Sequence, residues 1–157
     1  MAKKMTKIQK INQKMFNSGF STVEEWLKNK GWSVDCDYCV RDEIFFNGKY
    51  ITISKRQGPE KRLYALLHEC GHLLIQQNNV KYEENYPTQA RMNQFFTNKQ
   101  IERSKDYRVE TLIEEIEAWN RGTNLAKRLG IFINEKNYRK LANECIYSYI
   151  GWAAKRY

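Results

Sequence analysis

The segment His68-Glu69-Cys70-Gly71-His72 has the clearest chemical potential in the chain. On a helix, residues four apart share one face and lie about one turn apart, roughly 6 Å along the axis. His68 and His72 are the only histidines in the sequence, and this spacing lets both reach one metal ion at about 2.0–2.1 Å. Glu69 would then lie beside the ion, where it can take a proton from water. The pattern predicts a zinc site with a general base; the alternative is a helix carrying two incidental surface histidines.

The motif lies in a segment that reads as one helix over residues 59–77. Gly58-Pro59 breaks the preceding chain, Pro59 suits the first helical position, and Glu60 favours a helix N-terminus. Gly71 in the middle of this helix costs about 1 kcal/mol relative to alanine. We therefore expect another backbone, or a substrate, to approach closely there. The predicted buried stripe consists of Leu63, Leu66, Leu67, Cys70 and Leu74.

The residues before this helix predict two helices and a small antiparallel sheet. Apolar residues at helical spacing predict a basic helix over residues 3–17. Ser21 and Glu24 form a capping-box pattern for a second short helix, which Gly31 ends. Strands are predicted at 32–34, 44–46 and 50–53, and Asn47-Gly48 joins the last two as a hairpin.

The second half of the chain predicts a long loop followed by two helices. Residues 78–107 are polar and weakly periodic, so we expect a loop with at most one short helix near 88–96. Helical periodicity returns over 109–129 and again over 137–156. A chain of 157 residues fits one domain with a proper core. We expect a mainly helical α+β single domain with basic N-terminal helices at 1–30, a core at about 32–130 and a C-terminal helix at about 137–156.

The formal net charge is +9, and five lysines lie near the N-terminus: Lys3, Lys4, Lys7, Lys10 and Lys14. Such a cluster can hold a protein near nucleic acid or an acidic partner. The alternative is an ordinary solvated helix face, and no helix-turn-helix, zinc-finger or RNA-binding signature supports nucleic acid. No apolar stretch approaches the ~20 residues that span a bilayer, and no apolar region follows the basic start. We expect a cytoplasmic protein with no membrane association.

The spacing of the four cysteines indicates no clear set of disulfides or zinc ligands. Cys36 and Cys39 form a C-x-x-C pair, but a structural zinc site would need a second pair, which the sequence lacks. Their favoured interpretation is loop or core cysteines, while a redox pair and a zinc or assembly role remain alternatives. Cys70 and Cys145 fall on apolar helix stripes, where cysteine acts as a small buried hydrophobe.

The third ligand must come from elsewhere, because catalytic zinc usually has three protein ligands and no further histidine exists. A carboxylate is the natural choice, and one helix carries four glutamates: Glu110, Glu114, Glu115 and Glu117. Taking the apolar stripe of that helix as centred near Ile116, Glu115 lies closest to its edge. Glu117 is next, and Glu114 lies nearly opposite. We therefore predict Glu115 as the ligand, with Glu117 second, and expect most of the others to form a solvated acidic face.

Three segments together resemble a zincin metallopeptidase of the gluzincin kind, and most of all the compact ImmA/IrrE-type peptidases of bacteria and mobile elements. The strand Ile51-Thr52-Ile53 precedes the helix, Leu66-Leu67 leads into the H-E-x-G-H form of the motif, and Glu115-Ile116-Glu117-Ala118 is similar to the group's E-x-E-A run. The resemblance implies a zincin-like fold, with His68, His72 and Glu115 as zinc ligands and Glu69 as the general base.

The function expected on this basis is a zinc-dependent intracellular endopeptidase acting on a protein substrate, such as a regulatory protein. Glu69 would activate the water that attacks a peptide carbonyl. Tyr107, Tyr147 and Tyr149 are candidate oxyanion donors, and the strand at 51–53 is a candidate edge for β-addition of a peptide. One alternative is a zincin-fold binding or regulatory protein that uses its basic surface on nucleic acid or an acidic protein partner. Another is hydrolysis of a non-peptide bond.

Overall fold

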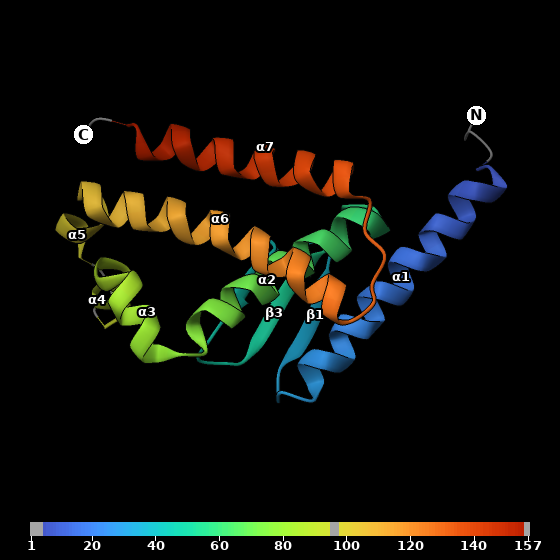
Figure 1. Ribbon diagram of the computed structural model, residues 1–157, viewed down its shortest axis with the longest axis horizontal. Helices are drawn as coiled ribbons and strands as arrows, with labels where there is room; N and C mark the ends of the chain where they lie inside the picture. Colours follow the sequence, from blue (N-terminus) through green and yellow to red (C-terminus); the bar gives the residue numbers. More distant parts are fainter. Residues whose placement is uncertain (1–4, 95–97, 156–157) are drawn as a thin grey trace.

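The computed structural model describes residues 5–94 and 98–155, which form a mainly helical α+β domain with a small sheet (Figure 1). The elements in chain order are α1 (Lys7–Lys28), β1 (Ser33–Asp37), β2 (Glu43–Phe45), β3 (Tyr50–Ser54), α2 (Pro59–Gln76), α3 (Asn79–Asn85), α4 (Pro87–Gln94), α5 (Lys99–Arg103), α6 (Lys105–Arg128) and α7 (Glu135–Ala153). The fold class and the helix carrying the histidine motif agree with the sequence prediction.

A single helix, α1, replaces the two helices predicted before residue 31. The predicted division into two helices is wrong, because residues 18–21 continue α1. Gly19 lies in this stretch and allows close packing: a Cβ there would lie 2.8 Å from the Ile131 side chain and 3.1 Å from that of Leu63. Ser21 and its predicted capping box lie inside the helix. The real capping box is at the N-terminus, where Thr6 caps α1.

The sheet has the order β1-β3-β2, with β3 in the centre. The predicted hairpin is confirmed, because β2 pairs antiparallel with β3. However, β1 pairs parallel with β3, so the sheet is mixed rather than wholly antiparallel. Both sides of β3 are therefore occupied, and residues 51–53 cannot offer an edge to a peptide as predicted. The free edges belong to β1 and β2.

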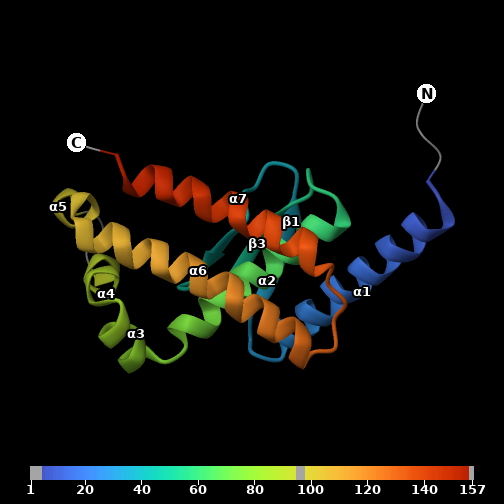
Figure 2. The same cartoon turned by 45° about the horizontal axis from the view of Figure 1, so that its top comes forward.

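The core forms where α2 packs between the sheet and α6. Ile51 and Ile53 of β3 are fully buried, as are Leu66 and Leu67 of α2 and Leu125 of α6. The second half of α1 joins the same hydrophobic cluster, and α7 lies along α6 (Figures 1 and 2). This arrangement places the motif helix at the centre of the molecule.

The short helix predicted near residues 88–96 corresponds to α4, but the long loop predicted over the rest of residues 78–107 is wrong, because α3, α5 and the start of α6 also lie there. Asn78 caps α3, and Asn98 caps α5. The N-terminus of α4 is capped from α6: the Glu110 carboxylate accepts hydrogen bonds from the Thr88 backbone N–H at 2.8 Å and from its hydroxyl at 2.7 Å. Short helices stabilised by polar caps leave no apolar periodicity in the sequence.

The last two helices begin slightly before their predicted starts because each has a polar cap. Ser104 accepts a hydrogen bond from the Tyr107 N–H at the start of α6, and Asn134 accepts from Asn137 N–H at the start of α7. Across residues 5–94 and 98–155, no helix combines the length and apolar character that crossing a membrane requires.

Candidate metal centre

The two motif histidines face each other from adjacent turns of α2. Their Nε2 atoms lie 3.3 Å apart, and each side chain is only 12% exposed. Two imidazole nitrogens directed at one point, with little access to water, can supply two of the three protein ligands of a catalytic zinc site.

Glu115 of α6 completes the group. Its two carboxylate oxygens lie 3.1 Å from His68 Nε2 and 3.3 Å from His72 Nε2. One ligand atom from each of the three residues falls within 4.8 Å of the others, so the group can hold a metal ion. Burial raises the pKa of Glu115, but hydrogen bonds from both histidines outweigh it and lower the pKa to about 2. Glu115 therefore offers an anionic oxygen at neutral pH.

The glycines of α2 and α6 let the two helices come close enough for these residues to meet. Gly71 lies against the backbone of α6, as its position in mid-helix predicted. In return, a Cβ on Gly122 would lie 2.7 Å from the Leu67 carbonyl oxygen of α2. Backbone contact at both points fixes the spacing of the helices on which the ligands stand.

Glu69 is buried beside the group, with 7% of its surface exposed. Burial raises the pKa of its carboxyl to about 7, while the positive charge of His72 opposes this shift and the negative charge of Glu115 adds to it. A carboxyl with a pKa near neutrality can both accept and release a proton under physiological conditions. The position predicted for the general base therefore has suitable electrostatics.

Glu114 is not on the solvated side of α6, so that prediction is wrong. It is 5% exposed, and its Oε1 lies 3.1 Å from His72 Nδ1. The error arose because the apolar stripe is not the buried face: Val109, Ile113 and Ile116 are 53%, 51% and 41% exposed. The structure instead buries the face that carries both Glu114 and Glu115.

The remaining two glutamates of the cluster have other roles. Glu117, the second choice for the ligand, is 39% exposed and pairs with Arg121 Nε at 2.8 Å. Glu110 caps α4. Among the described residues, Glu115 is the only one of the four in the candidate metal group.

Trp119, which the motif analysis did not select, stacks on His68. The ring centroids are 4.3 Å apart and the planes 23° from parallel. Tyr138 of α7 packs edge-on against Trp119 and donates a hydrogen bond from its hydroxyl to the Trp119 carbonyl oxygen at 2.9 Å. The position of Trp119, one turn after Glu115 on α6, is the sequence signal that could have identified it. Packing rather than polar contact holds the back of the His68 ring.

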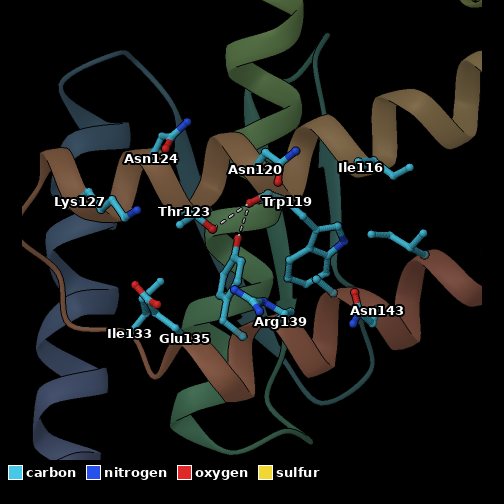
Figure 3. A pocket seen from close by; sticks show the side chains of 13 residues that line it. Ile116, Trp119, Asn120, Thr123, Asn124, Lys127, Ile133, Glu135, Arg139 and Asn143 are labelled. Carbon is cyan, nitrogen blue, oxygen red and sulfur yellow. Dashed lines mark hydrogen bonds between the residues drawn. The ribbon is translucent and has the colours of Figure 1, made fainter.

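A groove of about 570 Å³ runs between α6 and α7 (Figure 3). The amides of Asn120, Asn124 and Asn143 line it, together with Trp119. None of the three candidate ligands contributes to its lining. Trp119, which stacks on His68, is shared between the groove and the surroundings of the metal group.

One of the three candidate tyrosines reaches the centre. Burial raises the pKa of Tyr149 on α7, and the charge of Glu115 and a hydrogen bond with it raise the pKa further. Tyr147 is 76% exposed, and Tyr107 packs against Trp152 near the other end of α6. Of these three tyrosines, Tyr149 is therefore the one whose pKa responds to a candidate ligand.

The cysteines form no disulfide among the described residues, and all four are free. Cys36 lies on β1 and is half-buried, which raises the pKa of its thiol, and Cys39 is exposed in the following turn. Neither belongs to the candidate metal group found in the described part of the chain.

Comparison of the chain with protein-family models, with curated proteins and with solved structures found no match. The functional interpretation therefore rests on the geometry of the centre.

Proposed function

We propose that this protein is a zinc-dependent endopeptidase of the zincin type, related in design to the ImmA/IrrE-type peptidases, which acts on a protein inside the cell. One observation carries the proposal: His68, His72 and Glu115 converge on one point, with Glu69 buried next to them.

Zinc is the ion that suits this donor set best. Two imidazole nitrogens and one carboxylate oxygen, leaving one position open, are the usual ligands of catalytic zinc. The contact between Glu114 and His72 Nδ1 also fits, because histidines that bind metals generally donate their other N–H to a carboxylate or carbonyl. Zinc bound there would acidify water and polarise a carbonyl group.

Glu69 performs the proton transfers in the proposed reaction. Its carboxylate accepts a proton from the attacking water and then delivers it to the leaving amine. The burial that raises the pKa of Glu69 to about 7 makes both steps accessible near neutral pH. The second step requires that the side chain hold the proton briefly, which a carboxyl of ordinary pKa would do poorly.

Tyr149 is the proposed donor to the oxygen that becomes negative in the transition state. Its raised pKa keeps the phenol protonated at neutral pH, so that the hydroxyl can donate. The charge of Glu115 contributes to this raised pKa, which supports a place for the hydroxyl near the proposed ligands.

The free edge of β2 is the proposed binding site for the substrate backbone. An exposed strand edge can bind an extended peptide through main-chain hydrogen bonds. This strand packs against α2, which carries the proposed base, and the charge of Glu43 on β2 adds to the raised pKa of Glu69. A peptide paired with β2 would therefore pass beside the base, and this role replaces the one predicted for residues 51–53.

The test is hydrolysis of a mixed peptide library by zinc-loaded protein, followed by mass spectrometry. Wild type should cleave peptides, Glu69→Gln should bind zinc equally but lose about 10²–10⁴-fold in rate, and Glu117→Gln should resemble wild type. Equal cleavage by Glu69→Gln and wild type would contradict the role of the base. Absence of cleavage by zinc-loaded wild type, against the library and against proteins trapped by Glu69→Gln, would contradict the peptidase proposal.

We propose, as a second candidate, a binding role carried by the N-terminal half of α1. Lys7, Lys10 and Lys14 are exposed on one side of this half, while Ile8 and Ile11 are 70% and 49% exposed on the neighbouring side. Phosphates would satisfy the lysines but leave the apolar residues in water. An acidic protein segment with an apolar face satisfies both, so it is a better partner than nucleic acid.

Fluorescence anisotropy distinguishes the two partners. An acidic amphipathic peptide should bind wild type at physiological salt and bind Ile8→Ser at least several-fold more weakly. A DNA duplex should bind weakly and be insensitive to Ile8→Ser. The reverse ranking, with DNA preferred, would support a nucleic-acid surface instead.

A further inference from the structure

The two ring nitrogens of His72 have different surroundings. Nε2 faces His68 and Glu115 at 3.3 Å each, on the side of the candidate metal site. Nδ1 faces Glu114 Oε1 at 3.1 Å, on the opposite side of the ring. An ionised carboxylate can only accept a hydrogen bond, so Nδ1 must carry a proton and donate it to Glu114. When an ion replaces the second proton of the ring, at Nε2, the ring is neutral and the lone pair of Nε2 faces the ion.

Glu114 is itself held by donors from two other positions. Its Oε1 accepts a hydrogen bond from Gln76 Nε2 at 3.2 Å, and its Oε2 accepts one from the Tyr82 hydroxyl at 3.3 Å. A buried carboxylate needs several donors to remain ionised. Tyr82 belongs to α3, so the position of this carboxylate depends on a helix that contributes no ligand.

His68 lacks an equivalent arrangement. Among the described residues, its buried Nδ1 has no hydrogen-bond partner, and its ring is held by stacking on Trp119. The two ligands therefore differ in how they are oriented: His68 by the packing of an indole, His72 by a hydrogen-bonded carboxylate. Loss of the charge of Glu114 should therefore change the orientation of His72 but not that of His68.

We propose that Glu114 is a positioning residue that fixes the tautomer and ring orientation of His72, and that Tyr82 holds Glu114 in place from α3. The inference rests on the metal centre of the proposed function but not on peptide hydrolysis. It assigns α3, part of the segment predicted as a loop, a role in setting metal affinity. A shift of α3 would move Tyr82 and with it the Glu114 carboxylate. The orientation of the His72 ring, and therefore the affinity for the ion, would change as a result.

Zinc affinity, measured by competition with a chromophoric chelator, is the first test. Glu114→Ala should weaken zinc binding about 10–100-fold, which is the usual effect of removing such a partner. Glu114→Gln keeps the shape and one acceptor oxygen but loses the charge, so its loss should be smaller than that of Glu114→Ala. Tyr82→Phe should weaken binding by a smaller factor still, because the carboxylate remains.

Two matched controls exclude general damage. Glu117→Gln changes a half-exposed glutamate on the same helix, and Tyr86→Phe changes a tyrosine buried in the same cluster and packed on Tyr82 with ring centroids 5.3 Å apart. Both should bind zinc within about twofold of wild type. If Glu114→Ala and Glu114→Gln bind zinc as tightly as these controls, the proposal is overturned.

Nuclear magnetic resonance of the imidazole nitrogens supplies a readout that a purely structural role would not change. In zinc-loaded wild type, His72 should show a protonated Nδ1 whose N–H exchanges slowly with water. In Glu114→Ala this signal should exchange rapidly while the folded spectrum persists. An unprotonated Nδ1 in wild type would also overturn the proposal. Zinc-loaded wild type that shows these effects but cleaves no peptide would contradict only the peptidase function, whereas wild type that binds no zinc would contradict both.

Discussion

Gly71 of α2 and Ala118 of α6 are in direct backbone contact: a Cβ on Gly71 would lie 2.0 Å from the Ala118 carbonyl oxygen. No larger residue fits without moving one helix. Gly71 directly precedes the candidate ligand His72, and Ala118 lies three residues beyond Glu115. The contact therefore sets the distance between the two helices at the height of the candidate metal site.

Substitution Gly71→Ala should accordingly separate α2 from α6. The strain of forcing a methyl group into this contact should cost at least about 1–3 kcal/mol of unfolding free energy, despite the better helix propensity of alanine. Zinc affinity should fall as well, because Glu115 moves away from His72. Gly151→Ala is the control: a Cβ there meets nothing within 4 Å, so it should stabilise α7 by up to about 1 kcal/mol. Chemical denaturation and zinc titration of both variants would measure this, and a Gly71→Ala protein as stable as wild type would refute the packing argument.

Removal of the carboxylates should produce a definite order of zinc affinity. Glu115→Ala removes a direct ligand and should weaken binding more than Glu114→Ala, for which about 10–100-fold is expected. Glu117→Ala should have no effect, because Glu117 pairs with Arg121 away from the site. Zinc titrations on the three proteins would establish the order, and a larger loss for Glu117→Ala than for Glu115→Ala would show that the ligand is misassigned.

Tyr149→Phe should separate transition-state stabilisation from metal binding. Loss of the hydroxyl should lower kcat by about 10²–10³-fold, the usual effect of removing one oxyanion donor. Zinc content should stay the same, since Tyr149 is not a proposed ligand. Tyr147→Phe, at a position 76% exposed, is the control and should keep full activity. Steady-state kinetics with any peptide found to be cleaved would decide the matter, and an unchanged kcat for Tyr149→Phe would remove this residue from the mechanism.

Tyr64 should make the protein less stable at high pH. Burial raises the pKa of its phenol above 10, while the hydroxyl accepts a hydrogen bond from Asn134 N–H at 2.8 Å and donates to Glu60 at 2.9 Å. The folded state therefore keeps a proton that the unfolded state loses above about pH 10, so stability falls as the pH rises, by up to about 1.4 kcal/mol per pH unit.

Denaturant unfolding at pH 7.5 and pH 11 would test this expectation. Tyr64→Phe should be less stable than wild type at pH 7.5 by about 1–3 kcal/mol, because the Asn134 N–H loses its partner. Its further loss of stability between the two pH values should be smaller than that of wild type. An equal or greater loss in Tyr64→Phe would show that this phenol does not contribute to the pH dependence.

The sequence was most informative where local chemistry determines structure. Pro59, the apolar spacing of α2 and the Asn47-Gly48 turn act over a few residues, and the corresponding helix and hairpin were predicted correctly. The H-E-x-x-H spacing likewise places two imidazoles together on any helix. By contrast, a capping-box pattern is ambiguous from sequence alone: Ser21 and Glu24 were expected to begin a second helix, but they lie inside the continuous helix α1.

The face of α6 could not be read from hydrophobicity. Its buried side includes Glu114, Glu115 and Gly122, while Ile113 and Ile116 are exposed. The structure buries two carboxylates, Glu114 and Glu115, that an amphipathic pattern assigns to solvent, so the apolar stripe pointed away from the true interior. Glu115, the predicted ligand, lies in the candidate metal group because it borders both faces, but the contact of Glu114 with His72 depends on tertiary packing that no local pattern encodes.

The central claim is that His68, His72 and Glu115 bind one ion, and anomalous X-ray scattering at the zinc edge tests it most directly. Crystals of zinc-loaded protein should show one peak per chain, about 2.0–2.1 Å from the Nε2 atoms of His68 and His72 and about 2.0–2.2 Å from a Glu115 oxygen. No peak at this position, or a peak to which Glu115 contributes no oxygen, would contradict the account.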